Sequence, residues 1–422
     1  MNRFLQIFKV PDLRKKVIIV AFLLLVFRLM AAVPIPGVNF EQLRNLFASN
    51  QLFSFFNLFS GGTLDNLSIA MLGVGPYITA TIIMQLLMMV FPSIKEMYYE
   101  GGATGRAKFN RYSRYLTIPL AALQSYGFLN LLLSQGALNP LSGFEMFRNV
   151  VIIAAGSMVL TWLGELITEQ KIGNGTSMII FAGIISSLPT AVRNAIASYT
   201  PSAIPTYAAF IILAVLVIAG VVFITEGERK VPVAYSKRIR GNRVYGGVST
   251  YLPLKVNQAG VIPIIFAISI LLFPQFLAQI SAIVSPDLSL KLQELVARFL
   301  GNQTIYGAVY FLLVIVFTYF YTSITFDPKE IAQNLQRSGG FIPGIRPGEP
   351  SSQFISKVTN RITLFGSIFL GVIAVLPIVV QGLTGFQQLT IGGTALLIVV
   401  SVALETMKQL ESQLVMREYE GF

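Results

Sequence analysis

Side chains that could carry out covalent or acid–base chemistry are scarce in this sequence of 422 residues. It contains neither cysteine nor histidine, which removes thiol nucleophiles, imidazole bases, disulfides and the usual zinc sites. The glycine-rich stretch from Glu100 to Arg106 lacks the Gly-Lys-Ser/Thr ending of a phosphate-binding loop. The sequence therefore predicts no enzyme active site, no metal site and no cofactor.

Glu165 is the one carboxylate well inside an apolar segment. An acid in the membrane can carry proton or sodium coupling in a transporter, but such acids normally lie deep in the bilayer. Glu165 instead lies near the end of its predicted helix, where a carboxylate can reach the interface or pair with a base. We favour this second interpretation.

Two pairs of isoleucines occupy positions where a transporter would place polar groups. Ile78 and Ile82 are four residues apart in one apolar segment, and Ile180 and Ile184 are four apart in another. Each pair therefore lies on a single helical face. By composition alone these are ordinary packing or lipid-facing residues.

A weak internal repeat relates the two halves of the chain. The pattern Gly-Val-x-Pro-x-Ile occurs at 73–78 and again at 260–265, which makes Ile265 the counterpart of the isoleucine that ends the first copy. The fifth and tenth apolar segments both begin near a Gly-Thr pair, at 175–176 and 393–394. These coincidences indicate a five-plus-five duplication, with the functional interface between the halves.

The elements that would position these residues are membrane helices. Hydrophobic residues make up 54% of the chain and charged residues 12%, whereas about a quarter of a soluble domain is charged. The apolar residues fall in long blocks, and a bilayer core needs about 20 apolar residues per helix. Ten spans are predicted, at 17–33, 73–91, 115–133, 149–167, 176–189, 206–224, 258–280, 305–324, 362–380 and 386–404.

The basic residues are unevenly distributed between the loops. Of the 31 Lys and Arg residues, 22 lie in the N-terminal segment and in the loops 92–114, 226–257 and 325–361, and five lie in the loops of opposite parity. The positive-inside rule therefore places both termini in the cytoplasm.

The loop 226–257 has more positive charge than orientation requires. Seven basic residues stand there against Glu226 and Glu228 alone, and they include Lys237, Arg238, Arg240 and Arg243. Such a loop suits an acidic docking surface, either ribosomal RNA or an acidic protein.

Five separated stretches are similar to characteristic motifs of the SecY/Sec61 protein-translocation channel family. They are FFNLFSGG at 55–62, PYITA at 76–80, WLGELITE at 162–169 with IGNG at 172–175, PLKVNQAGVIP at 253–263, and FIPGIRPG at 341–348. The resemblance follows the whole chain in order.

The resemblance implies an all-α integral membrane protein of the bacterial cytoplasmic membrane. Ten transmembrane helices would form two pseudo-symmetric halves, at 1–190 and 191–422, with a short re-entrant plug helix at about 61–70. Such a protein is a channel and not an enzyme. It conducts unfolded secretory polypeptides across the membrane and releases membrane helices sideways, between spans two and three on one side and seven and eight on the other.

The resemblance also implies roles for particular residues. A ring of apolar side chains would close the pore: Ile78, Ile82, Ile180, Ile184, Ile265 and Ile398. The plug would include Leu64, Asp65, Asn66, Leu67 and Ser68. The residues expected to dock cytoplasmic partners are Lys237, Arg238, Arg240, Arg243 and Arg346.

The partners implied by the family are small membrane subunits similar to SecE and SecG, the SecA ATPase and the ribosome. Signal sequences, nascent polypeptides and membrane lipid would be its passing ligands. The alternative that the residues leave open is a secondary transporter built on inverted repeats.

Overall fold

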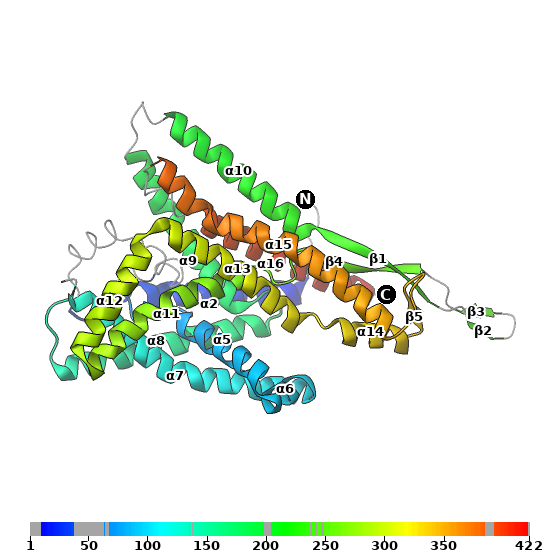
Figure 1. The fold of residues 1–422 in the computed structure, drawn as a ribbon, viewed down its shortest axis with the longest axis horizontal. Helices are drawn as coiled ribbons and strands as arrows, with labels where there is room; N and C mark the ends of the chain where they lie inside the picture. The colour runs from blue at the N-terminus through cyan, green and yellow to red at the C-terminus, as the bar shows by residue number, and fades with distance from the viewer. Residues whose placement is uncertain are drawn as a thin grey trace.

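The computed structural model describes residues 10–37, 63, 67–134, 136, 138–197, 204–235, 238–240, 243–245, 249–384 and 392–420. Long helices lie side by side in an elongated bundle, and a β-ribbon projects from one end of it (Figure 1). We call this the ribbon end.

Each of the ten predicted spans corresponds to a helix. They are α2 (Pro11–Ala32), α5 (Gly75–Val90), α7 (Gly102–Ser134), α8 (Gly143–Glu169), α9 (Gly175–Ala197), α10 (Ile204–Glu226), α11 (Ile262–Val284), α13 (Gln303–Thr325), α15 (Glu349–Thr384) and α16 (Gly392–Glu420). In the described chain, α7, α8, α10, α13 and α15 are long and apolar enough to cross a membrane alone. The remaining predicted spans have shorter apolar runs or flanking charges, such as Lys15 and Lys16 in α2.

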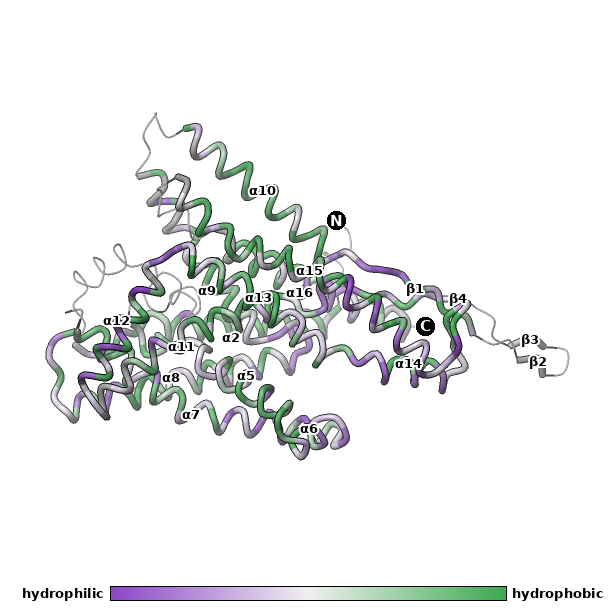
Figure 2. Tube along the Cα trace, in the orientation of Figure 1, coloured by the Kyte–Doolittle hydropathy of each residue, from purple (hydrophilic) through white to green (hydrophobic). Residues whose placement is uncertain are grey.

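Three shorter helices lie at the ends of the bundle. α6 (Pro92–Tyr99) follows α5 across a bend of 108°, and the two could together make a sixth crossing by composition. α14 (Pro328–Arg337) lies towards the ribbon end and α12 (Pro286–Gly301) at the opposite end (Figure 1). Hydrophobic residues follow the middle of the bundle, whereas hydrophilic residues concentrate in α6, α14 and the ribbon (Figure 2).

The ribbon is built from the loop between α10 and α11. Strands β1 (Glu228–Tyr235) and β4 (Ser249–Lys255) pair antiparallel, and β5 (Gly340–Phe341) adds to the other edge of β1. A separate hairpin of β2 (Arg238–Arg240) and β3 (Arg243–Tyr245) forms the tip. The sequence analysis did not predict these strands, so the description as all-α holds for the membrane part only.

Local sequence explains where several helices begin. Ser142 and Glu145 form a reciprocal capping box at the start of α8, and Asp327 accepts two backbone N–H groups at the start of α14. Proline stands in the first turn of α2, α5, α6, α11, α12 and α14, where its missing N–H costs nothing.

Candidate pore constriction

A cavity of about 580 Å³ lies among α5, α7, α8, α9 and α11. About half of its wall is polar, and three of the predicted ring residues, Ile78, Ile180 and Ile265, line it as well. Gln85 also lines the cavity, and its buried Oε1 has no hydrogen-bond partner in the described protein. The cavity is therefore a polar vestibule that reaches an aliphatic surface.

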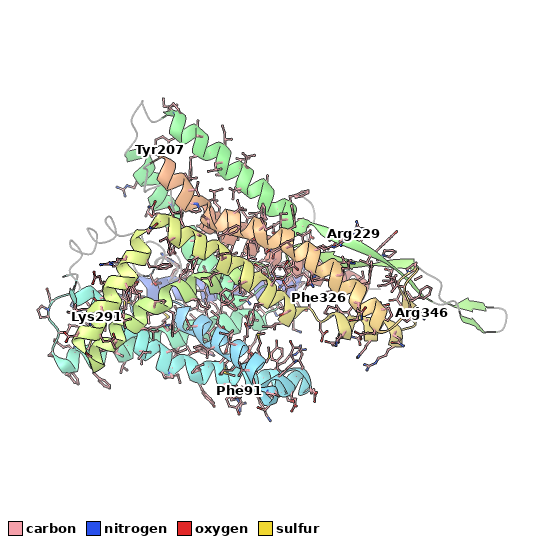
Figure 3. The ribbon with its side chains drawn as sticks, in the orientation of Figure 1. Phe91, Tyr207, Arg229, Lys291, Phe326 and Arg346 are labelled. Atoms are coloured by element: carbon pink, nitrogen blue, oxygen red, sulfur yellow. The ribbon has the colours of Figure 1, made fainter. Side chains whose placement is uncertain are left out.

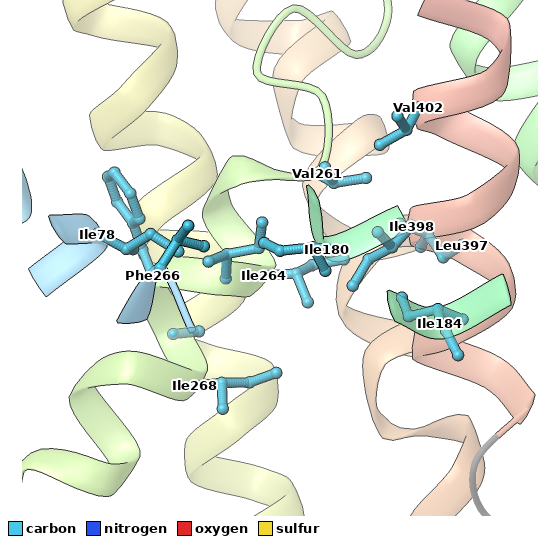
Figure 4. Close-up of a cluster of buried hydrophobic side chains, with 14 of the residues drawn as sticks. Ile78, Ile180, Ile184, Val261, Ile264, Phe266, Ile268, Leu397, Ile398 and Val402 are labelled. Atoms are coloured by element: carbon cyan, nitrogen blue, oxygen red, sulfur yellow. The ribbon is translucent and has the colours of Figure 1, made fainter. Parts of the chain in front are cut away.

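The six predicted isoleucines all belong to one buried hydrophobic cluster. They come from four helices that are far apart in the sequence: α5, α9, α11 and α16. Figure 4 places Ile78, Ile180 and Ile398 at one level, with Ile264 between them, and Ile184 one turn further along α9. We call this level the pore waist. The structure thus brings the predicted set together, while its role in closing a pore stays a prediction.

Ile82 and Val74 differ in how they relate to the vestibule. On α5 the vestibule is lined by Tyr77, Ile78, Thr81 and Gln85, and Ile82 is not among its lining residues. Val74 lies one turn before Ile78, beyond the end of the vestibule, and is fully buried in the same cluster. Val74 therefore lies on the opposite side of the waist from the vestibule. The sequence analysis did not assign a role to this residue.

The weak repeat has a counterpart in the backbone. Gly73 and Gly260 both have positive φ, 57° and 61°, a conformation that favours glycine. Val74 and Val261 follow them, and each valine carbonyl accepts the N–H of the isoleucine that ends its motif, at 3.1 and 3.3 Å. The repeat could have identified Val74, because a valine follows the first glycine in both copies.

Glu165 is paired, as the sequence analysis favoured. Its Oε2 lies 3.1 Å from Nη1 of Arg114 on α7, and both side chains line the vestibule. Both are partly exposed, so the pair is screened and is worth at most about 1 kcal/mol to stability. The partner is 51 residues away in the sequence and could not be named from it.

The predicted plug is only partly described. Leu64, Asp65 and Asn66 lie outside the described residues, whereas Leu67 and Ser68 are fully buried. Residues 67–74, which we call the turn segment, form consecutive turns and not a helix. The predicted plug helix is thus absent from 67–70.

Four of the five predicted docking residues are described, and they lie on the ribbon and beside it. Lys237 lies outside the described residues, and Arg238, Arg240 and Arg243 belong to the hairpin at the tip, where Arg240 and Arg243 are paired positions. Arg346 is exposed in the turn before α15, near the ribbon (Figure 3). The four described residues therefore lie at the ribbon end.

A many-helix membrane bundle with a polar vestibule above an aliphatic waist defines a channel-like membrane protein. Its fold is similar to a solved protein conducting channel, with a TM-score of 0.67 and 21% identity over 94% of this chain and 91% of that chain. It is also similar to Sec61 in the canine ribosome–channel complex from the endoplasmic reticulum, with a TM-score of 0.63 and 19% identity over 94% and 91%.

The family model for SecY matches residues 68–407. The protein translocase subunit SecY of Mycobacterium bovis is 43% identical over 445 aligned residues, which cover 100% of this chain and 99% of that protein. The chain belongs to the SecY family.

Proposed function

We propose that this chain is the pore-forming subunit of a protein-conducting channel in the bacterial cytoplasmic membrane. The class of protein, a multi-pass membrane channel and not an enzyme, follows from its family. The observation that carries the proposal is the polar vestibule that ends at buried isoleucines from four helices. A wetted entrance above a dry constriction is the arrangement that holds back ions until a polypeptide enters.

The waist closes the pore by dewetting. Ile78, Ile180, Ile184, Ile265 and Ile398 present only aliphatic surface, so a water column through them loses its hydrogen bonds. Isoleucine side chains can still yield around a chain of variable width. Val74 is the alternative to Ile82 as the sixth residue of the ring, because it lies one turn before Ile78 in the same cluster.

The turn segment belongs to the plug that blocks the outer side of the waist. Leu67 and Ser68 are buried although Asp65 and Asn66 precede them in the sequence, which is consistent with a polar segment folded back into a cavity.

The lateral gate would open between α5 and α7 on one side and α11 and α13 on the other. Tyr99, on α6, donates a hydrogen bond of 3.3 Å to the carbonyl of Ile324 in α13. Phe266 of α11 packs edge-to-face against Phe317 of α13, so these two helices form one side of the gate. An arriving signal sequence or membrane helix would break the Tyr99 bond, and each central Leu, Ile, Phe or Val that reaches lipid would contribute about 0.3 to 0.6 kcal/mol.

Both termini and the ribbon would face the cytoplasm. Lys16 of α2 donates to Gln413 of α16 at 3.0 Å, so the two terminal helices meet at the same end of the bundle. The basic ribbon would then contact a ribosome. The similar canine Sec61 structure is part of a ribosome–channel complex. SecA and small subunits similar to SecE and SecG are expected as further partners.

Cross-linking between the plug and the waist tests the proposal. The chain has no cysteine, so one can be introduced at a position in 64–68 and a second at Ile184 or Ile398. Oxidation should link them efficiently in the resting channel and less when a translocating polypeptide is trapped. If no such pair links, the plug assignment is wrong.

The transporter alternative has no support in the comparisons. In the described chain, Glu165 is paired with Arg114 at the vestibule wall, four residues before the end of α8.

A further inference from the structure

We infer that Gly156 of α8 is the seat of the turn segment, a positioning residue that holds the plug and the lower edge of the waist in the closed arrangement. The inference rests on the proposed channel function. It concerns a residue outside the ring, the plug and the docking surface.

Gly156 touches the turn segment at its backbone. A Cβ built on Gly156 would lie 2.0 Å from the carbonyl oxygen of Ile69 and 2.8 Å from its carbonyl carbon. No rotamer change can relieve a clash with a carbonyl, so any side chain at this position must displace the backbone at Ile69. Glycine is therefore required by the close approach of two backbones, and not by a special φ.

The chain after α2 holds the same segment from another side. Ile35 N–H donates to the carbonyl of Leu67 at 2.9 Å, and Ile69 N–H donates to the carbonyl of Val33 at 2.9 Å. These two bonds flank the bridge between Pro34 and Ser68. The turn segment is thus held at Ile69 between Gly156 of α8 on one side and the extended residues 33–35 on the other.

The turn segment connects two separate hydrophobic clusters. Leu67 and Met71 pack in a cluster with Phe128 of α7, whereas Ala70 and Val74 pack in the cluster of the waist isoleucines. Ile69 lies in the chain between these residues, so a shift of its backbone would disturb the packing of both clusters. Displacement from the seat therefore loosens the plug and moves Val74 away from the waist in one step.

Gly164 on the same helix provides a matched control. A Cβ built there lies 3.4 Å from Cγ2 and from the backbone N of Thr176, which is close to an ordinary contact. Both Gly156→Ala and Gly164→Ala gain the same helix propensity. A difference between the two variants therefore reports the contact with Ile69 and not the change of residue type.

The experiment measures exposure of the segment in the intact translocase complex, reconstituted in liposomes. Met71 is fully buried, and Met71→Cys introduces one cysteine into a chain that has none. In this background, Gly156→Ala should raise the rate of modification by a membrane-impermeant maleimide on the order of tenfold, since overpacking disfavours the seated state. Resting ion conductance should rise with it. Gly164→Ala should leave both at the parent level.

A folded Gly156→Ala complex whose cysteine stays as protected as in the parent, with unchanged conductance, would overturn the seat. If Gly156→Ala does not accumulate as a complex, Ile69→Pro removes the bond to Val33 and frees the segment from its other side. It should raise modification in the same way, and its failure to do so also overturns the inference. Export of a signal-bearing substrate by the parent is measured in the same vesicles, and its absence refutes the channel function instead.

Discussion

Replacing Ile398 by asparagine tests the pore waist directly. Ile398 is 0% exposed, and Figure 4 shows it directed from α16 towards Ile180 and Ile264. Asparagine is smaller and puts an amide where only aliphatic groups face the pore. The neighbouring Leu397 is equally buried in the same cluster, but its side chain leaves α16 about 100° around the helix from that of Ile398. It therefore provides the control.

The size of the effect follows from burial. Losing a fully buried isoleucine removes about 1.5–3 kcal/mol from the closed state. Burying an amide without a hydrogen bond costs about 1–3 kcal/mol more. In the open state the residue contacts water or polypeptide, so these terms act mainly on closure. Even the lower sum, about 2.5 kcal/mol, shifts the closed-to-open ratio by a factor of about 60.

The assay is ion conductance of the purified complex in planar bilayers, with secretion of a substrate that has a defective signal sequence as a second readout. Ile398→Asn should raise resting conductance and relax the signal requirement. Leu397→Asn should destabilise the protein without producing a leak of the same size. Parent-level conductance in Ile398→Asn, or an equal leak in Leu397→Asn, would refute the reasoning.

Three further predictions follow from named contacts. Tyr99→Phe removes a hydrogen bond to Ile324 worth about 0.5–1.5 kcal/mol, so cross-linking across the lateral gate should fall about two- to tenfold; unchanged cross-linking would separate this bond from the gate. Glu165→Gln should leave polypeptide export near the parent rate, because the pair it breaks is partly exposed; complete loss of transport would revive the coupled-transporter reading. Charge reversal at Arg243 and Arg346 should weaken ribosome or SecA binding at low salt while thermal stability stays nearly constant, and full binding under those conditions would exclude both as docking residues.

The membrane part of the fold could be predicted because its signal is local. An apolar run of sufficient length must form a helix in lipid, so each of the ten predicted spans coincides with a helix, including 17–33 with α2. The ribbon was missed although β1 alternates, with Val231 and Val233 buried and their neighbours more exposed. Pro232 is unusual inside a strand, and the charged residues before Val231 leave too few apolar positions to recognise an alternation of two.

The candidate site was predictable in its residue type but not in all its contacts. Helical spacing and the resemblance to the family selected six isoleucines that do lie in one cluster. Because only isoleucines were considered, the sequence analysis overlooked Val74, although both copies of the repeat contain a valine at that position. The pairing of Arg114 with Glu165 and the contact of Gly156 with Ile69 depend on distant segments, which no local pattern encodes.

The ribbon also has a mechanical consequence. β1 starts two residues after α10 ends, and eight residues at about 3.3 Å each make it an arm of about 26 Å. Its base is closed by a bond from Val256 N–H to the carbonyl of Gly227, and a Cβ at Gly366 of α15 would meet the carbonyl of Val256 at 2.7 Å. The base of the arm is therefore held rigidly against the helices. A force on the tip of the ribbon would act as a torque on α10 and α11, and Ile265 lies in the first turn of α11.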